Sequence, residues 1–542
     1  VTVTMGVGGA DIGGHGAIGI KFVTRSGSNP FAGSAYEYYR SPELNSNYWF
    51  NERNNLPKND VKLNQYGVRQ GGPIVIPGLY DGRNKAFFFF NYEEVRLPNN
   101  FSRTRTVLDP RAQQGWFRYT VTVGGAPQVR EVNVLELAAA NGQLATIDPT
   151  IARVLGYINQ SVGQDGARLN LSSDPLINDF VWQSPGHQTE KQPVLRLDYN
   201  LGQNHRLSGT LNQIWVVRDP DQLNNGDRRF PTGTNYGKYV STRPSRSIAL
   251  RSTLSANLVN ELRGGITKGG GSFFGQDETN GVSTFSDTGG YALDLDAGNV
   301  LGAGLTNWHV ENEPTWRSGY SYSLDETLTW LKGKHSITTG GAMFLGRTWA
   351  NGQVMVPEID LGFDQTLDPA NGLFTTTTFQ GASTAQLTDA RALYAMLTGR
   401  VQAVNGEAAL DKNNQYVAFG PRFREGNMDE YSAFVQDSWR IKPTLTINAG
   451  VRWDVQMPFS PSNDIMSSAS LESICGVSGV GSGEIYDRCN FFDPGARGGA
   501  VPQFDQLTKG TLGYHTDWNN VAPNVGFAWQ PRMESGFWRK IL

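Results

Sequence analysis

The chain has no long apolar run. Only 38% of its 542 residues are hydrophobic, and no segment approaches the roughly 18 consecutive apolar residues that a membrane-spanning helix needs. The strongest apolar run, Ala86–Phe90, has the length of a β-strand. A bundle of transmembrane helices is therefore excluded.

Neither sign of charge dominates. The 47 Lys and Arg residues and the 50 Asp and Glu residues give a formal net charge of −3. A chain without an excess of basic residues has no global field that would attract nucleic acid. We therefore expect no nucleic-acid partner.

Signatures of enzymes are missing as well. H-E-x-x-H, C-x-x-C and G-x-S-x-G do not occur. Glu93 and Glu94 are neighbours, so on a strand they face opposite sides and cannot form the carboxylate pair of a glycosidase. Gly14–Gly19 matches G-x-G-x-x-G, but a predicted strand follows where a dinucleotide site needs a helix. We expect no enzymatic activity.

Cysteine is scarce. Cys475 and Cys489 are the only two, and they lie close together in a stretch rich in Gly and Ser. A loop disulfide in an oxidising compartment would have this pattern, and two free thiols are the alternative.

The two ends of the sequence resemble neither a natural start nor a natural stop. The chain begins at Val1 without an initiator Met or a secretory signal, and it ends where a new strand is predicted to start, at Trp538. We expect an internal piece of a longer polypeptide.

Aromatic residues and strand-like alternation are abundant. The 13 Trp, 20 Tyr and 27 Phe make 11% of the chain, which suits a membrane barrel with aromatic girdles at both interfaces. In Leu445–Trp453 and in Leu195–Leu201 every second residue is apolar and the others are polar. This pattern predicts strands with one apolar and one polar face.

Tight turns alternate with long polar connections. Four predicted hairpins have this form: Pro193–Leu201 with Arg206–Val217, Ser247–Ser255 with Val259–Thr267, Tyr320–Leu331 with His335–Arg347, and Tyr431–Arg440 with Thr444–Val455. Long loops are expected at about 97–192, 218–246, 268–319, 348–430 and 456–523. A sandwich or propeller is not expected to place all its long loops at one end. A bacterial outer-membrane barrel does, because its periplasmic turns are short and its extracellular loops are long.

Further strands extend this pattern in both directions. They are predicted at Ile20–Arg25, Ser34–Tyr39, Asn64–Val75, Lys85–Arg96 and Asn524–Gln530. From Ser34 onward we predict about twelve strands, with a thirteenth from Trp538. Helical spacing in Val134–Leu155 predicts a small loop subdomain, and Gln386–Val401 predicts a helix outside the membrane or in the lumen. The predicted fold is therefore all-β, a large transmembrane antiparallel β-barrel.

The run Gly19–Tyr38 resembles the junction between plug and barrel in TonB-dependent outer-membrane receptors. More narrowly, it resembles the Oar-like group, whose full-length members carry an N-terminal carboxypeptidase-regulatory-like domain. The resemblance continues in sequence order through Gly71–Ile74, Ala86–Glu93, Leu258–Arg263, Val435–Arg440 and Ala522–Pro531.

This resemblance implies a barrel of about 22 strands with a plugged lumen, of which about 12–13 would be present here. Residues 1–30 would be the C-terminal end of the plug domain with the plug–barrel junction, and residues 31–542 the N-terminal half or more of the barrel. The TonB-ExbB-ExbD system supplies energy to the members of this family. The protein would contact that system through an N-terminal region that this sequence lacks. The implied junction residues are Gly19, Lys21, Thr24, Arg25, Ser26, Gly27 and Gly33.

Several other side chains are candidates for binding. Arg196 and Arg452 lie on polar strand faces, where they would contact plug or substrate, or simply water in the lumen. Trp308, His309 and Trp316 fall in or near a predicted extracellular loop, where aromatic rings can stack on a sugar or grip a peptide; membrane-interface aromatics are the alternative.

Two acidic loop segments could gather oxygen ligands for Ca²⁺. They are Asp294–Asn299, and Asp219 and Asp221 with Asn224, Asn225 and Asp227. Neither has the full EF-hand spacing, and solvated turns are the alternative. We expect no resident metal or cofactor.

The resemblance implies active import of a large or scarce substrate, such as a peptide, glycan or chelate, across the outer membrane. A surface adhesion or assembly protein on the same barrel is the alternative. A passive porin is disfavoured by the plug-like first 28 residues. The other expected partners are outer-membrane lipid, lipopolysaccharide and an unknown extracellular substrate.

Overall fold

The computed structural model describes residues 2–5, 9–11, 13, 18–59, 61–164, 167–233, 237–275, 283–296, 301, 304–309, 313–413, 415–469 and 504–530. Cys475, Cys489, most of the Gly14–Gly19 motif and the strand predicted from Trp538 lie outside these residues.

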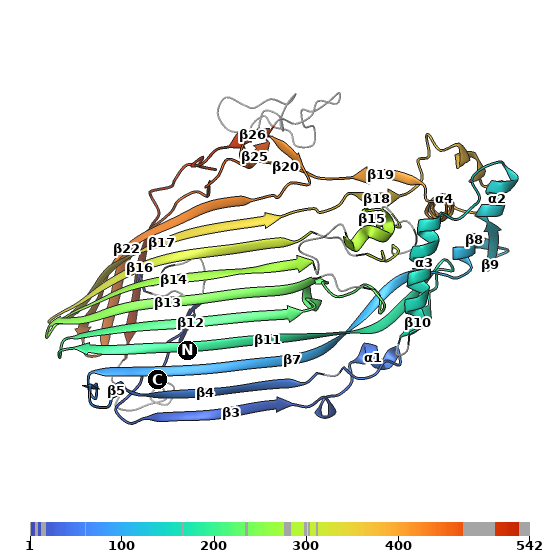
Figure 1. Cartoon of the computed structure of the whole chain (residues 1–542). Coiled ribbons are helices and arrows are strands. Elements are labelled where there is room, and N and C mark those ends of the chain that lie inside the picture. Colours follow the sequence, from blue (N-terminus) through green and yellow to red (C-terminus); the bar gives the residue numbers. More distant parts are fainter. Residues whose placement is uncertain are drawn as a thin grey trace, which may run out of the picture.

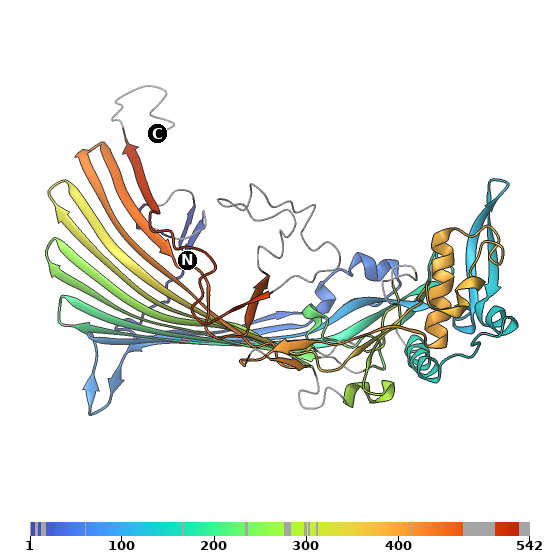
Figure 2. The same ribbon diagram turned by 90° about the horizontal axis from the view of Figure 1, so that it is seen from above.

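An antiparallel sheet of 14 strands makes up most of the structure (Figure 1). Its strands follow the chain in space, and β3 and β27 lie at the two ends of the strand order. The sheet is strongly curved, like part of a barrel wall (Figure 2). Its main strands are β3 (Ala32–Arg40), β4 (Leu63–Pro73), β7 (Ala86–Leu108), β11 (Ile177–Leu201), β12 (His205–Asp219), β13 (Gly237–Ser255), β14 (Leu258–Gly275), β16 (Thr315–Lys332), β17 (His335–Gly352), β22 (Arg424–Lys442), β23 (Leu445–Gln456) and β27 (Val521–Trp529).

Tight turns join the strands at one end of this sheet, as predicted. Gly202 and Gly333 adopt positive φ angles of 71° and 61° in two of them, a backbone conformation that glycine reaches without steric cost. The connection between β4 and β7 at the same end carries a small hairpin, β5 (Val75–Ile76) with β6 (Tyr80–Asp81). The described parts of the long connections lie toward the opposite end (Figures 1 and 2).

The strands run further into the loop side than predicted, so the predicted loop bounds need correction. β7 continues to Leu108, β11 starts at Ile177, and β22 starts at Arg424. On the loop side, the stretches between the main strands are 41–62, 109–176, 220–236, 276–314, 353–423 and 457–520. The ends of these strands are polar because they extend beyond the apolar band of the membrane. The alternation of apolar and polar residues that identifies a lipid-facing strand in the sequence is therefore lost there.

Two loops that are far apart in sequence fold together into one unit, which we call the loop module. It contains β8 (Trp116–Val123), β9 (Ala126–Asn133), α2 (Val134–Ala140) and α3 (Pro149–Val162) from the first loop, and α4 (Thr384–Thr398) from the second. Tyr394 Oη donates to Leu144 O at 2.7 Å, and Asp148 N donates to Leu397 O at 2.9 Å. One hydrophobic cluster runs through all these elements.

The helical spacing in Val134–Leu155 corresponds to two helices, α2 and α3, of the loop module. Pro149 stands at the first turn of α3, and the Asp148 carboxylate caps its start by accepting from the amides of Thr150 and Ile151. Proline lacks an amide and fits only the first turn of a helix, so the helix has to begin anew here. α4 agrees closely with the predicted Gln386–Val401 and belongs to the loop module.

None of the described helices is long and apolar enough to cross a membrane. The strand predicted at Ile20–Arg25 is found earlier and is shorter, as β2 (Ile18–Lys21).

Shorter elements accompany the large sheet. They are β1 (Thr2–Met5) paired with β2, α1 (Trp49–Arg53), β10 (Arg168–Leu171), β15 (Ala292–Asp294), β18 (Glu358–Leu361), β19 (Val401–Asn405), β20 (Ala408–Leu410), β21 (Tyr416–Ala418), β24 (Ser460–Pro461), β25 (Met466–Ala469), β26 (Phe504–Leu507) and short 3-10 turns at Pro42–Leu44, Ala112–Gln114, Gln222–Asn224, Ser283–Thr288 and Pro369–Leu373.

The two faces of the sheet differ in chemistry, as the alternation predicts. On β11, Leu195 and Leu197 lie on one face, which we call the outer face, and Arg196 and Asp198 on the other, which we call the lumen face. The N-terminal segment runs along the lumen face, on the concave side of the sheet (Figure 2).

Candidate functional site at the junction

The residues between β2 and β3 cross the lumen face of the sheet without forming a strand. Arg196 Nη1 donates to Thr24 O at 2.7 Å, and Ser26 Oγ donates to Asp198 Oδ2 at 2.8 Å. The implied junction segment is therefore held by two side chains of β11.

Asp198 is the centre of this contact. Its side chain is completely buried, and Arg196 donates to both of its oxygens at 2.9 Å from the adjacent inward position on β11. Arg206, on the neighbouring strand β12, donates to Asp198 Oδ1 at 3.2 Å and to Ser26 Oγ at 3.0 Å. Two guanidinium groups thus surround one carboxylate, and the hydroxyl of Ser26 completes the set.

Glycine is required where the segment approaches the sheet backbone. A Cβ on Gly27 would collide with the carbonyl oxygen of Phe88 and lie 2.7 Å from Gly72 O. A Cβ on Gly33 would lie 2.7 Å from Arg69 O. Real Cβ atoms essentially never come this close to a backbone oxygen, so only glycine fits at these two positions.

The other implied junction residues have plainer surroundings. Gly19 and Lys21 lie in β2, paired with Thr4 and Thr2 of β1. Arg25 is exposed and makes no hydrogen bond or ion pair with the described residues. Asp198 and Arg206 were not among the predicted site residues. The signal that could have found Asp198 is the Arg-x-Asp spacing, which puts both side chains on one strand face.

A second Arg-x-Asp pair lies on β23. Arg452 Nε donates to both carboxylate oxygens of Asp454 at 2.9 Å, and its Nη1 donates to Ala10 O at 3.3 Å. The amide of Ala10 in turn donates to Gln436 Oε1 at 2.6 Å. The peptide groups on both sides of Ala10 are therefore held by the wall, and Gly13 lies directly against the Arg452 guanidinium.

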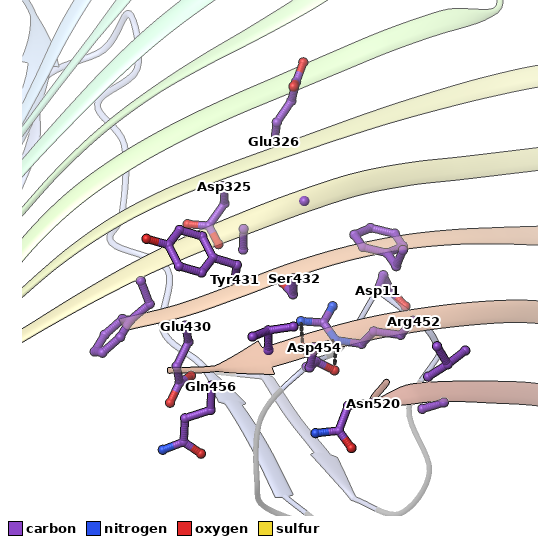
Figure 3. A pocket seen from close by; sticks show the side chains of 18 of the residues that line it. Asp11, Asp325, Glu326, Glu430, Tyr431, Ser432, Arg452, Asp454, Gln456 and Asn520 are labelled. Carbon is purple, nitrogen blue, oxygen red and sulfur yellow. Dashed lines mark hydrogen bonds and ion pairs between the residues drawn. The ribbon is translucent and has the colours of Figure 1, made fainter. Parts of the chain in front are cut away.

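A cavity of about 780 Å³ opens beside this second contact (Figure 3). It lies between Asp11 and Gly13 and the lumen face of strands β16 to β27. Carboxylates are its main charged groups, and Arg452 is the guanidinium among them. The acidic lining residues of the lumen side are Asp11, Asp325, Glu430 and Asp454.

The predicted extracellular contact residues do not form one exposed site. Phe230 stacks on Trp308 with ring centroids 5.6 Å apart, and Tyr157 packs against the same indole at 5.3 Å. The side chain of His309 is 9% exposed and pairs with Asp287 at 3.1 Å. Burial lowers the pKa of His309, and the Asp287 carboxylate opposes that shift. Trp316 is separate, half-buried on β16. Trp308 and His309 thus pack within the loop side, which corrects the expectation of open binding rings.

The first acidic loop is already neutralised by protein groups. Arg103 donates to both carboxylate oxygens of the fully buried Asp227, at 2.8 Å and 2.7 Å. Asn224 donates to Asp221 at 2.6 Å. A carboxylate bound by a guanidinium is a poor cation ligand, so this segment does not match the Ca²⁺ site considered above.

The second acidic segment is divided between different neighbours. The carboxylate of Asp296 accepts the amides of Leu301 and Leu305. Asp294 instead lies with Glu358 and Asp360, with oxygens within 4.8 Å of one another, because β15 and β18 pair in parallel. Residues 297–299 of the predicted segment lie outside the described residues.

A large curved antiparallel sheet with an apolar outer face, tight turns at one end and long loops at the other defines an outer-membrane β-barrel protein. The chain matches the family described as outer membrane beta barrel domain over residues 23–537, and it belongs to this family. Its location is the bacterial outer membrane. No curated protein matches the chain at a significant level.

Solved structures with a similar fold are outer-membrane transporters and receptors. The outer membrane transporter YddB from Escherichia coli is 9% identical, with a TM-score of 0.32, over 74% of this chain and 36% of that one. The siderophore receptor PirA from Acinetobacter baumannii is 10% identical, with a TM-score of 0.34, over 81% and 41%. The ferric-catecholate import receptor Fiu from E. coli is 10% identical, with a TM-score of 0.29, over 84% and 62%. The chain thus spans less than two thirds of the length of each.

Proposed function

We propose that this chain is the junction and part of the barrel wall of a TonB-dependent importer, as its resemblance to the Oar-like group implies. The observation that carries the proposal is that Ala10 is bound by Arg452, and Ser26 by Asp198, on the lumen face of the sheet. A porin needs no segment tied across its lumen. A plugged transporter does, because the plug has to stay attached while it opens a path.

In this proposal the region that precedes residue 1 contacts TonB and the long loops receive the substrate. The substrate is a molecule too large or too scarce for porins, such as a peptide, glycan or chelate. The residues at the mouth belong to the loop module, whose hydrophobic core joins two loops into one unit.

An adhesion or assembly protein on the same barrel is the second candidate. The observation in its favour is the same loop module, in which two loops share one hydrophobic core and are joined by the hydrogen bond from Tyr394 to Leu144. The two candidates differ in their need for energy, since adhesion requires no TonB.

The test uses the full-length gene in its natural host, compared with a TonB-box deletion and a complete gene deletion. Uptake of labelled peptide, glycan and metal-chelate mixtures is measured together with attachment to surfaces. We expect at least one mixture to accumulate in the wild type and to fail in both deletion strains, with attachment unchanged in the TonB-box deletion. Unchanged uptake of every mixture, together with lost attachment in the complete gene deletion, would replace import by adhesion.

A further inference from the structure

The outer face carries two levels of aromatic side chains. Tyr320 and, by register, Trp349 lie toward the loops, whereas Trp330 and Trp439 lie toward the turns. Tyr320 and Trp330 are ten residues apart on β16, so they are about 33 Å apart along the strand, or about 25 Å along the membrane normal at a barrel's usual tilt. This matches the height of the apolar band between two aromatic girdles, so Tyr320 marks the outer-leaflet boundary.

A groove of about 600 Å³ crosses the outer face between β11 and β16, below this boundary. Its walls are apolar side chains: Leu195, Leu197, Leu211, Ile248 and Ile266. Two glycines form its floor, because Gly209 and Gly264 stand in one cross-strand row on either side of Ile248. A Cβ on Gly264 would meet nothing closer than 3.8 Å, so the hollow exists because the side chain is missing.

A guanidinium lies at the loop-side end of the groove. Arg246 pairs across the strands with Leu211 and Ile266, and the next residue in that row is Tyr322. It is exposed and makes no hydrogen bond or ion pair with any residue that the structure describes. By contrast, Arg347 on the same face is paired with Asp429.

A second cation lies one level closer to the loops. Lys268 pairs in register with Tyr320, and its ammonium group lies 5.0 Å from the ring centroid. An unpaired cation on the lipid-facing surface is costly unless it reaches an anion. Lys268 lies level with Tyr320, and Arg246 lies one row below, so its long side chain has only a short way to extend to the lipid phosphates at the boundary. Arginine is suited to them because its planar fork binds phosphate oxygens in pairs.

We propose that this groove is a binding site for a phosphorylated, acylated lipid of the outer leaflet. One acyl chain lies over Gly209 and Gly264 between the leucine and isoleucine side chains, and a phosphate group binds Arg246 with support from Lys268. The inference depends on the barrel and its orientation, and it holds for an importer and for an adhesion protein alike.

The test uses the full-length protein, purified from outer membranes and exchanged into lipid-free detergent. Purified lipid A and its dephosphorylated form are added separately, and the bound lipid is counted by native mass spectrometry. Arg246→Gln removes the phosphate ligand, and Gly264→Leu fills the groove. Arg251→Gln is the matched control, because Arg251 is an exposed arginine of the same strand on the lumen face. Heat-modifiable migration in gels shows that each variant is folded.

We expect Arg246→Gln and Gly264→Leu each to reduce lipid A binding at least fivefold, while Arg251→Gln binds like the wild type. The dephosphorylated lipid should bind the wild type as weakly as lipid A binds Arg246→Gln. Equal binding of the two lipids by the wild type would overturn the phosphate assignment. Folded Gly264→Leu protein that keeps full binding would overturn the groove.

Discussion

Asp198 balances two arginines at the junction, and its charge has no substitute within the described residues. Because the largely buried guanidinium of Arg196 would lose its carboxylate partner, we expect Asp198→Asn to lower the free energy of unfolding by about 3 kcal/mol. Ser26→Ala removes one hydrogen bond to that carboxylate and should cost about 1 kcal/mol. Urea unfolding of the full-length protein in detergent measures both.

Arg25→Gln is the control for these variants, since Arg25 is exposed and makes no hydrogen bond or ion pair with the described residues. It should leave the unfolding midpoint unchanged. If Asp198→Asn behaves like Arg25→Gln, the Asp198 cluster does not stabilise the junction.

Gly27 gives a steric test of the same segment. Its added methyl group would meet two carbonyl oxygens of the sheet backbone, which cannot move aside as a side chain can. We expect Gly27→Ala to cost more than about 2 kcal/mol through displacement of the segment. Gly269→Ala on β14 is matched to it, because a Cβ there meets no atom within 4 Å. Limited proteolysis between residues 18 and 31 should be faster in Gly27→Ala alone.

The carboxyl group of Asp389, in α4, should make the stability of the loop module depend on pH. Burial, with further contributions from the carboxylates of Asp174 and Asp296, raises the pKa of Asp389 to about 6. The folded module therefore favours the protonated acid, so this group's stabilising contribution is present below about pH 4 and is lost as the pH rises through 6.

The matching variant is Asp389→Asn, which keeps the shape and removes the titration. We expect it to raise the stability of the module at pH 7.5 by about 1 kcal/mol, with little change at pH 4. The expected gain is small because Asp389 is only partly buried and its charge is partly screened by solvent. Amide hydrogen exchange of α3 and α4 at the two pH values measures this. A stability difference between variant and wild type that is the same at both values would contradict the pKa shift of Asp389.

Among the structural elements, α4 connects the two halves of the loop module. Ser383 and Gln386 form a capping box at its start, and Tyr394 bonds across to the other loop. Ser383→Ala should cost about 1 kcal/mol by leaving amides of the first turn unpaired. Tyr394→Phe should cost a similar amount and should also speed hydrogen exchange in 134–162, which belongs to the other loop. Exchange that changes only within 384–398 would mean that the two loops are independent.

The hairpins could be predicted from sequence because each has a local signal. Leu445–Trp453 alternates strictly and a tight turn precedes it, so both the strand and its partner could be identified. The strand ends could not, since residues such as those of 97–108 lie beyond the lipid and lose the alternation. Tertiary contacts could not be predicted either, because nothing in the local sequence around Asp198 or Tyr394 indicates a partner 172 or 250 residues away.

At the scale of the whole molecule, the N-terminal segment is held at two places of unequal strength. At the junction, Ser26 and Thr24 contact a buried carboxylate cluster and Gly27 is packed on the backbone. At the second place, near Ala10, the contacts of the described residues are made by peptide groups, beside a cavity of about 780 Å³. If the plug moves during transport, the junction is expected to act as the fixed end and the Ala10 contact to release.

A reversible crosslink tests this order. The double variant Ala10→Cys with Gln436→Cys places two thiols at this contact. The two side chains start close together, because a Cβ built on Gly450 would lie within 3.1 Å of the Cβ atoms of both residues. We expect the oxidised double variant to lose TonB-dependent uptake and to regain it on reduction, because the disulfide holds closed the contact that has to open. Each single variant should transport normally under both conditions. Unimpaired uptake by the fully oxidised protein would mean that Ala10 stays on the wall while substrate passes, and that the path lies elsewhere in the lumen.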